Sequence, residues 1–175
     1  MFNLIEEKQI PLLDVKAKLF KDSKFNCQHL HFESENDEKV FMVAFKTVPE
    51  DSTGIAHILE HTALCGSKKY PVRDPFFMML RRSLNTFMNA FTSSDWTAYP
   101  FATQNDKDFK NLLNVYTDAA FFPNLNRLDF YQEGHRFEFD ENNELQIKGV
   151  VFNEMKGAMS SASAQLWHGM TKHLY

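Results

Sequence analysis

The sequence lacks the features of a secreted, membrane-spanning or nucleic-acid-binding protein. Its first residues do not form the basic start and continuous apolar stretch of a secretory signal, and no later apolar run approaches the length that crosses a bilayer. Lys and Arg total 19 against 23 Asp and Glu, which gives a net charge of -4, and the basic residues are scattered along the chain. We therefore expect no membrane partner and no nucleic-acid partner.

Cysteine is also scarce. Cys27 and Cys65 are the only two, which is too few for the disulfide framework of a small secreted domain. A reduced thiol is the simpler expectation for Cys65. Together with the missing secretory signal, this predicts a cytoplasmic protein.

Apolar residues are plentiful enough for a packed core. The 175 residues are 43% hydrophobic and include 18 Phe, a composition typical of a globular domain. Strand-like patterns over residues 26–33, 39–47 and 96–103 mix with helical patterns over 55–62, 76–84, 106–121, 128–137 and 150–164. This order predicts an α+β fold, with helices packed on an antiparallel or mixed sheet in layers, in a single domain over residues 1–175.

Two details of this pattern can be tested directly. The polar stretch 34–38 reads as a hairpin connection, so the strands on either side of it are expected to pair. Pro100 is expected to break the strand over 96–103, because proline has no backbone N–H for a sheet.

The strongest functional signal is the sequence His-Ile-Leu-Glu-His at positions 57 to 61. In a helix, His57 and His61 lie one turn apart on one face, so both imidazoles can bind a single metal ion. This His-x-x-Glu-His order is the known motif of the inverzincins, which are zinc peptidases. Glu60 lies beside the histidine pair, where a carboxylate can accept the proton of a water that zinc acidifies.

Four blocks, the first of which contains this motif, make the chain resemble the pitrilysin or insulinase family of zinc metallopeptidases, nearest to its presequence-protease and falcilysin branch. They are GIAHILEHTALCGSKKYPVRDPF at 54–76, LNTFMNAFTSSDWTAYPFAT at 84–103, QEGHRFEF at 132–139 and GVVFNEMKGAMS at 149–160. The resemblance implies that His57, His61 and Glu154 bind Zn²⁺ and that Glu60 is the general base. The sequence departs from the family at Ile147, where many insulinase-like enzymes have a carboxylate, and at His135, where the branch more often has Trp.

The block at 84–103 also resembles the edge strand on which this family binds its substrate. An extended peptide can add to such an edge through backbone hydrogen bonds. The substrate-contact candidates are Asn89, Ala90 and Phe91, and the expected partners are unstructured peptides.

The family builds its peptidase from two similar halves, and the second half supplies an Arg and a Tyr that stabilise the reacting carbonyl. The resemblance therefore implies that this chain is an N-terminal half-domain, truncated at its C-terminal side, whose partner is the missing half or a complementary subunit. We expect a zinc endopeptidase segment that is weak or inactive alone, since losing one such donor costs about a hundredfold or more in rate.

Two other functions remain open on the sequence. The first is an inactive module that binds peptides along its sheet edge and uses zinc structurally, although structural zinc normally has four protein ligands. The second is an S-ribosylhomocysteine lyase, which shares the His-x-x-Glu-His order but takes a Cys well after the motif as its third ligand. Here no Cys follows Cys65.

Overall fold

The computed structural model describes residues 1–174 and separates into two compact units, Met1–Glu38 and a second unit that begins at Lys39. Each unit has its own sheet, and the mixture of antiparallel sheets and helices confirms the predicted α+β class. The single domain over residues 1–175 stays a prediction.

The first unit is a three-stranded antiparallel sheet in the order β1-β2-β3. Its elements are β1 (Phe2–Ile10), a 3-10 turn (Pro11–Leu13), β2 (Val15–Asp22) and β3 (Gln28–Glu33). The carboxylate of Asp22 accepts hydrogen bonds of 2.9 Å from the backbone N–H groups of Lys24 and Phe25, which closes the turn between β2 and β3.

The expected pairing of the strands before and after residues 34–38 is wrong. β3 pairs with β2, whereas β4 (Lys39–Lys46) pairs with β7 (Trp96–Thr103) in a separate sheet. Sequence reasoning missed β1, whose centre is a run of charged and polar residues, and overlooked the alternation of Val15, Ala17 and Leu19 with lysines, which is typical of a half-buried strand, in β2. Because β2 was not predicted, the nearest predicted strand that could pair with β3 was β4.

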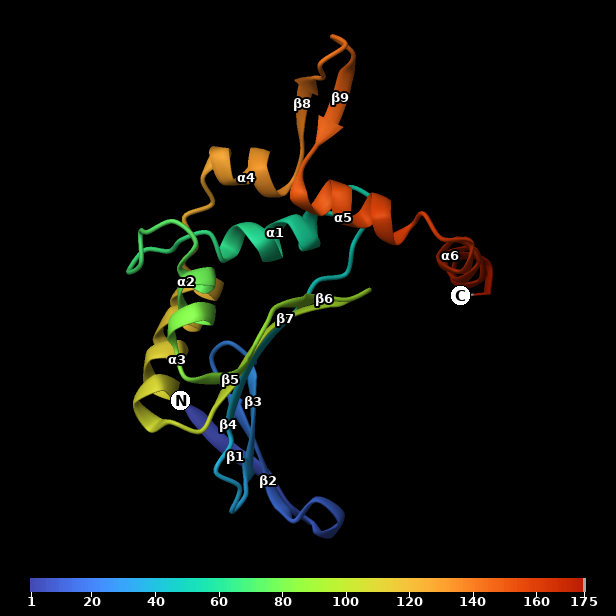
Figure 1. Cartoon of the computed structure of the whole chain (residues 1–175). Coiled ribbons are helices and arrows are strands. Elements are labelled where there is room, and N and C mark those ends of the chain that lie inside the picture. Colours follow the sequence, from blue (N-terminus) through green and yellow to red (C-terminus); the bar gives the residue numbers. More distant parts are fainter. Residues whose placement is uncertain (175) are drawn as a thin grey trace. The chain divides into compact units, whose positions relative to one another are not determined.

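The second unit is built around β7, which lies between β4 on one side and β5 (Asn85–Met88) with β6 (Phe91–Thr92) on the other (Figure 1). The helix α3 (Asp106–Phe121) packs against β4 and β7, and α2 (Pro75–Arg82) packs against α3. The shared core contains the buried residues Ala63, Phe76, Met88, Tyr99, Phe101, Leu112 and Tyr116.

The sequence specifies α3 clearly, and its predicted range is confirmed. The side chain of Asn105 accepts hydrogen bonds of 3.0 Å from the backbone N–H groups of Lys107 and Asp108, which caps the first turn. Apolar residues then recur at helical spacing and are buried at Leu112, Val115, Tyr116 and Ala119.

Pro100 does not break β7, contrary to the prediction, because its missing donor faces an interruption in the neighbouring strand. In antiparallel pairing the N–H and C=O of one residue point to the same side. The carbonyl of Pro100 accepts from the Asn89 N–H at 3.2 Å, so the ring nitrogen also faces Asn89, between β5 and β6. The carbonyl of Asn89, left without a strand donor from Pro100, accepts from the Tyr116 hydroxyl at 3.3 Å.

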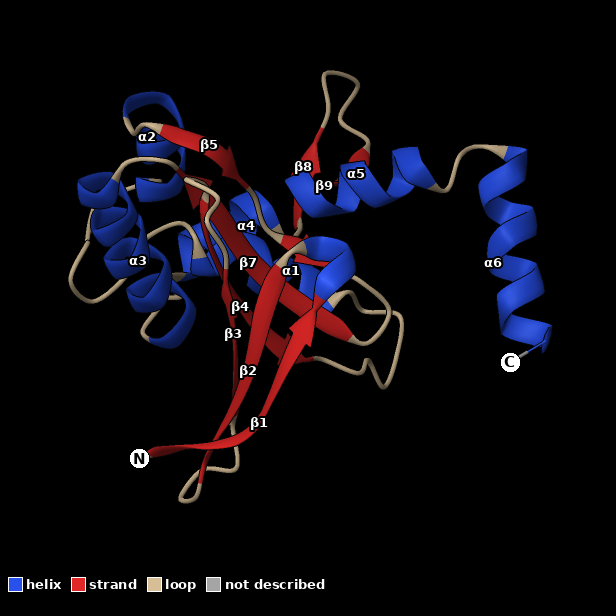
Figure 2. Ribbon diagram, turned by 90° about the horizontal axis from the view of Figure 1, so that it is seen from below, coloured by secondary structure: helices blue, strands red, loops and turns tan. Residues whose placement is uncertain are grey.

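After α3, the chain forms α4 (Arg127–Glu133), a hairpin of β8 (Arg136–Phe139) and β9 (Leu145–Lys148), and then α5 (Val150–Ala158) and α6 (Ala162–Leu174). The predicted helix 128–137 is therefore too long, because the chain leaves the helix at Gly134. The predicted helix 150–164 is likewise two helices separated by residues 159–161, and α6 turns sharply away from α5 (Figure 2).

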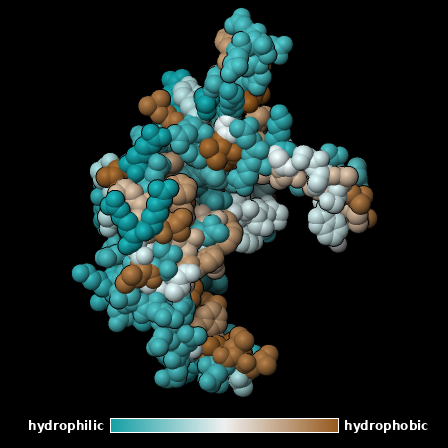
Figure 3. Space-filling model, viewed as in Figure 1, coloured by the Kyte–Doolittle hydropathy of each residue, from teal (hydrophilic) through white to brown (hydrophobic). Residues whose placement is uncertain are grey.

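The β8–β9 hairpin and the helices α5 and α6 differ in the polarity of their surfaces. In the space-filling view the β8–β9 hairpin is mostly hydrophilic, whereas the arm of α5 and α6 carries pale and brown atoms (Figure 3). No residue of α6 is buried, and its exposed apolar side chains are Leu166, Trp167, Met170 and Leu174. None of the helices in residues 1–174 combines the length and the apolar character needed to cross a bilayer.

Candidate metal centre

The helix α1 (Ile55–Ala63) carries both histidines of the motif. His57 and His61 are one turn apart, and their ring centroids lie 5.0 Å from each other. The helix begins directly after Gly54, which takes a left-handed φ of 75° where a side chain is disfavoured. It packs against β6, β7, α4 and α5. The helix that carries the two imidazoles is therefore held in place by packing on several sides.

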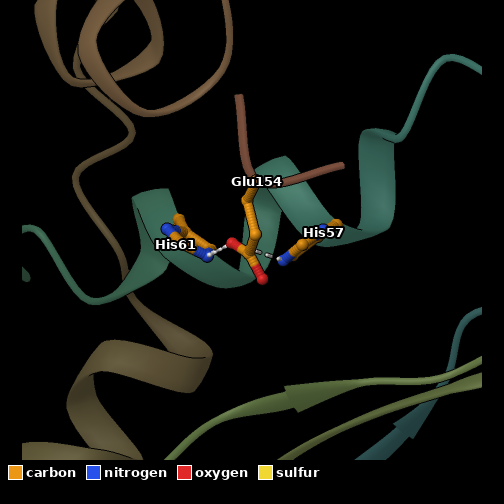
Figure 4. A group of neighbouring side chains, drawn as sticks. All are labelled: His57, His61 and Glu154. Atoms are coloured by element: carbon orange, nitrogen blue, oxygen red, sulfur yellow. Dashed lines mark ion pairs between the residues drawn. The ribbon is translucent and has the colours of Figure 1, made fainter. Parts of the chain in front are cut away.

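Glu154 on α5 reaches this histidine pair from a second helix (Figure 4). Its Oε2 lies 3.7 Å from the Nε2 atom of His57 and 3.7 Å from the Nε2 atom of His61. One ligand atom from each of these residues lies within 4.8 Å of the others. The structure thus brings together three residues that are separated by up to 97 positions in the sequence.

Close backbone contact helps to place α5. A Cβ on Gly149, which precedes α5, would lie 1.9 Å from the carbonyl oxygen of Gly134 at the end of α4. Only glycine fits in that space. The start of α5 is therefore held against the end of α4, and α4 itself contacts α1.

Glu60 lies on the side of α1 that faces the sheet. Only 6% of its surface is exposed, and its Oε2 accepts a hydrogen bond of 2.5 Å from the Thr92 hydroxyl on β6. The Thr92 hydroxyl lies 3.3 Å from that of Thr97, which lies 2.8 Å from that of Thr47. Burial, and then the nearby charge of Glu60, raise the pKa of Tyr99. The Glu60 carboxylate is thus enclosed but has a hydroxyl donor.

The other ring nitrogen of His61 also has a partner. Its Nδ1 lies 3.1 Å from Oε2 of Glu133, the last residue of α4. Sequence reasoning missed both Glu133 and Thr92. They lie 72 and 32 positions from their partners, so no local spacing marks them, and the only signal was their presence inside the quoted blocks.

The substrate-contact candidates lie where β5 and β6 are interrupted. Asn89 and Ala90 connect the two strands, and Phe91 begins β6, which pairs with β7 on one side only. The N–H of Ala90 donates to its neighbour's side chain, Asn89 Oδ1, at 2.9 Å. Within residues 1–174, no strand is paired to the outer edge of β6, and α1 contacts β6 directly.

The remaining histidines and cysteines lie outside this cluster. His29 and His31 stack on β3 with ring centroids 6.2 Å apart. Cys65 is buried, and its thiol donates to the His61 carbonyl oxygen at 3.5 Å. Burial, and then the charge of Glu133, raise the pKa of Cys65 to about 12. In the described part of the chain, His57, His61 and Glu154 form the only group of three or more His, Cys, Asp or Glu with metal-binding geometry.

The donor chemistry of this group fits zinc. Two imidazole nitrogens and one carboxylate oxygen are a frequent ligand set of catalytic zinc, which keeps a fourth position open for water or substrate. A carboxylate on the distal nitrogen of a ligating histidine is the usual support of such a site. The carboxylate of Glu133 lies at this position relative to His61, 3.1 Å from its Nδ1 atom.

Comparison with known proteins places this arrangement in a family. The model of the insulinase family (Peptidase family M16) matches residues 47–164. The chain therefore belongs to the insulinase family of peptidases. This confirms the resemblance read from the four sequence blocks and the prediction that the chain comes from a metallopeptidase family.

The similar proteins agree on the branch. The chain is 56% identical over 163 residues to "Presequence protease, mitochondrial" of Xenopus tropicalis, covering 91% of this chain and 16% of that protein. It is 49% identical over 178 residues to the protein of the same name from Schizosaccharomyces pombe, covering 99% of this chain and 18% of that protein. The fold resembles the crystal structure of pitrilysin, with a TM-score of 0.62, 22% identity, and coverage of 73% of this chain and 14% of that chain. The chain thus spans about a sixth of the length of the curated relatives it matches.

Two earlier expectations are corrected by these relatives. The predicted cytoplasmic location is wrong, because the similar presequence proteases are named as mitochondrial. The argument failed because reduced thiols and the lack of a secretory signal do not distinguish the cytosol from the mitochondrial matrix. Membership of the insulinase family also sets aside the lyase alternative.

Proposed function

We propose that this chain supplies the metal-binding and water-activating part of a zinc endopeptidase that cleaves unfolded peptides. The observation that carries the proposal is the meeting of His57, His61 and Glu154 on one side of α1, within 4.8 Å, with the carboxylate of Glu60 on the same helix. Family membership supports it, because the same residues fall inside the matched range.

The residues divide the chemistry between them. His57, His61 and Glu154 hold the metal. When bound, zinc polarises the scissile carbonyl and makes a water molecule more acidic. Glu60 accepts the proton of that water and returns it to the leaving amine. Its burial and its hydrogen bond from Thr92 hold the carboxylate in one orientation for both transfers.

The open edge of β6 supplies the place for the peptide. We propose that an extended substrate pairs with backbone groups of Asn89, Ala90 and Phe91, since β6 lacks a partner on its outer side within residues 1–174. The contacts between α1 and β6 support this assignment, because a peptide bound there runs beside the helix that carries Glu60.

The small share of its relatives' length that this chain covers is relevant to its activity. Since this chain spans 16% to 18% of those proteins, we propose that it cleaves peptides slowly or not at all when alone, and that a further protein segment or subunit completes the peptidase. An inactive peptide-binding module is the competing function, and it differs in having no turnover even when completed. The relatives' names lead us to propose a mitochondrial location.

The test measures zinc stoichiometry by elemental analysis and cleavage of a quenched fluorescent peptide. We expect about one zinc per chain in the wild type and in Glu60→Gln, and loss of zinc in Glu154→Ala. Glu141→Ala, which removes an exposed carboxylate from the β8–β9 turn, is the control and should retain zinc. Full zinc loading in Glu154→Ala would contradict the ligand assignment.

Cleavage is then compared for the wild-type chain and Glu60→Gln, alone and inside a full-length relative. We expect Glu60→Gln to abolish turnover in the full-length protein at unchanged zinc content. Equal turnover by wild type and Glu60→Gln would remove Glu60 from the mechanism. Absence of turnover in a zinc-loaded full-length protein would favour the binding module.

A further inference from the structure

The distal nitrogen of His61 contacts a carboxylate that comes from a separate helix. Glu133 Oε2 lies 3.1 Å from His61 Nδ1, on the side of the ring opposite to the Nε2 atom that faces Glu154. The Glu133 side chain is only 13% exposed, so this contact is largely shielded from water. A carboxylate kept in such a place is stable only when it is hydrogen-bonded.

The position of Glu133 is fixed by its surroundings. Its second oxygen, Oε1, accepts from Gln132 Nε2 at 2.9 Å, and the side-chain oxygen of Gln132 accepts in turn from Arg73. The next residue, Gly134, lets α4 end directly against α1, because a Cβ there would lie 3.0 Å from Ile58 Cγ2. The carboxylate is therefore held in place from both sides, by its hydrogen bonds and by its backbone.

His57 differs from His61 in this respect. Within residues 1–174, its ion pair is with Glu154 through Nε2, and no carboxylate lies within ion-pair distance of its Nδ1. The two histidines of one motif thus have different supports. The difference indicates a specific function for Glu133, which lies outside the motif.

We propose that Glu133 is a positioning residue for the metal centre: by accepting a hydrogen bond from His61 Nδ1, it fixes the tautomer and ring orientation in which Nε2 points at the metal. This rests on the proposed function, because it assumes that His61 binds zinc through Nε2. An imidazole with a free distal nitrogen can exchange tautomers and rotate, and outer partners of this kind contribute about 10- to 100-fold to metal affinity.

The test measures zinc affinity by competition with a chromogenic chelator, on the 175-residue chain and without any peptidase assay. Glu133→Leu removes the acceptor, and we expect zinc binding to weaken by about 10- to 100-fold. Glu133→Gln keeps the size and an amide oxygen that accepts a hydrogen bond, so it should recover most of the loss. Asp129→Asn is the matched control, because it removes a negative charge from the same helix at a side chain that contacts Asn126 instead.

A second measurement separates positioning from general damage to the fold. In the zinc-loaded wild type, the Nδ1 proton of His61 should be visible by ¹⁵N-edited NMR of the imidazole and protected from exchange with water. It should be lost in Glu133→Leu, retained in Asp129→Asn, and accompanied by unchanged far-ultraviolet circular dichroism in both.

The outcomes distinguish this inference from the proposed function. Wild-type chain that binds no zinc overturns both. Wild type and Glu133→Leu with equal zinc affinity overturn the positioning of His61 alone, as does a His61 Nδ1 proton that stays protected in Glu133→Leu. An equal loss of affinity in Asp129→Asn would show that charge, and not the contact with His61, is responsible.

Discussion

The helices α1 and α5 carry the candidate metal ligands of one cluster but are embedded to different extents. In α1, Glu60, Thr62 and Ala63 are buried, and the side chains of His57 and His61 are 20% and 24% exposed. In α5, only Val151 is buried, and the Glu154 side chain is 55% exposed. The α1 half of the centre is therefore part of the core of its unit, whereas the α5 half is lightly packed.

This difference assigns the two halves different energetic roles. Packing fixes the two histidines before any metal arrives, so they lose little conformational freedom on binding. The carboxylate of Glu154 is not fixed in this way, and ordering it opposes binding. We infer that zinc binding stabilises α5 more than α1, since a bound ligand stabilises the state that binds it.

The largest difference in stability is expected when the same Ala→Leu substitution is made on each of the two helices. Ala63 on α1 is 3% exposed and belongs to the core cluster, whereas Ala158 at the end of α5 is exposed. Ala63→Leu should lower the free energy of unfolding by about 1 to 3 kcal/mol through overpacking. Ala158→Leu should change it by less than about 0.5 kcal/mol.

Urea denaturation of both variants without zinc measures this difference. Similar destabilisation by the two substitutions would mean that α5 is as well embedded as α1, and the contrast between the helices would not stand.

The contrast also predicts where zinc acts. Without metal, backbone amides of α5 should exchange with deuterium faster than those of α1, because few buried contacts hold α5. Saturating zinc should slow exchange in α5 on the order of tenfold, or about 1.4 kcal/mol, and change α3 little. Hydrogen exchange followed by mass spectrometry gives the rates, and Glu154→Ala should abolish the zinc effect. Equal slowing in α1 and α5 would show that the site forms as one unit.

Sequence reasoning succeeded where a local pattern is decisive. The range of α3 follows from the Asn105 cap and the buried residues at helical spacing, and the motif on α1 needs only the spacing of its histidines. It failed where the outcome depends on a distant partner. The pairing of β3 with β2 and the intact strand at Pro100 are of this kind. The break between α5 and α6 is different, because its signal is local: the Ser161 hydroxyl accepts a hydrogen bond of 3.2 Å from the Ala164 N–H and caps α6.

The same limit applies to the candidate site. His57, Glu60 and His61 are found from five consecutive residues, whereas Glu154 came only through the family resemblance. Thr92 and Glu133 contact the motif from β6 and α4, and nothing in their local sequence indicates those contacts. The candidate ligands and the candidate base could thus be listed from the sequence, but the side chains that contact them could be found only from the fold.

The smallest disturbance to the fold is expected from a chemical probe at the end of α1. Cys65 lies just beyond this helix and is buried, whereas Cys27 is exposed. Because the thiolate is the reactive form, a pKa of about 12 leaves about one Cys65 thiol in 10,000 ionised at pH 8. Iodoacetamide should therefore modify Cys27 and leave Cys65 intact. Raising the pH should increase the rate of Cys65 modification by about tenfold per pH unit until the fold opens.

Peptide mass mapping gives the modification rates of both cysteines. Cys27→Ser is the control, because it should abolish rapid labelling. Rapid labelling of Cys65 at pH 8 would mean that the end of α1 opens readily, which would contradict the firm embedding of this helix and reduce its difference from α5.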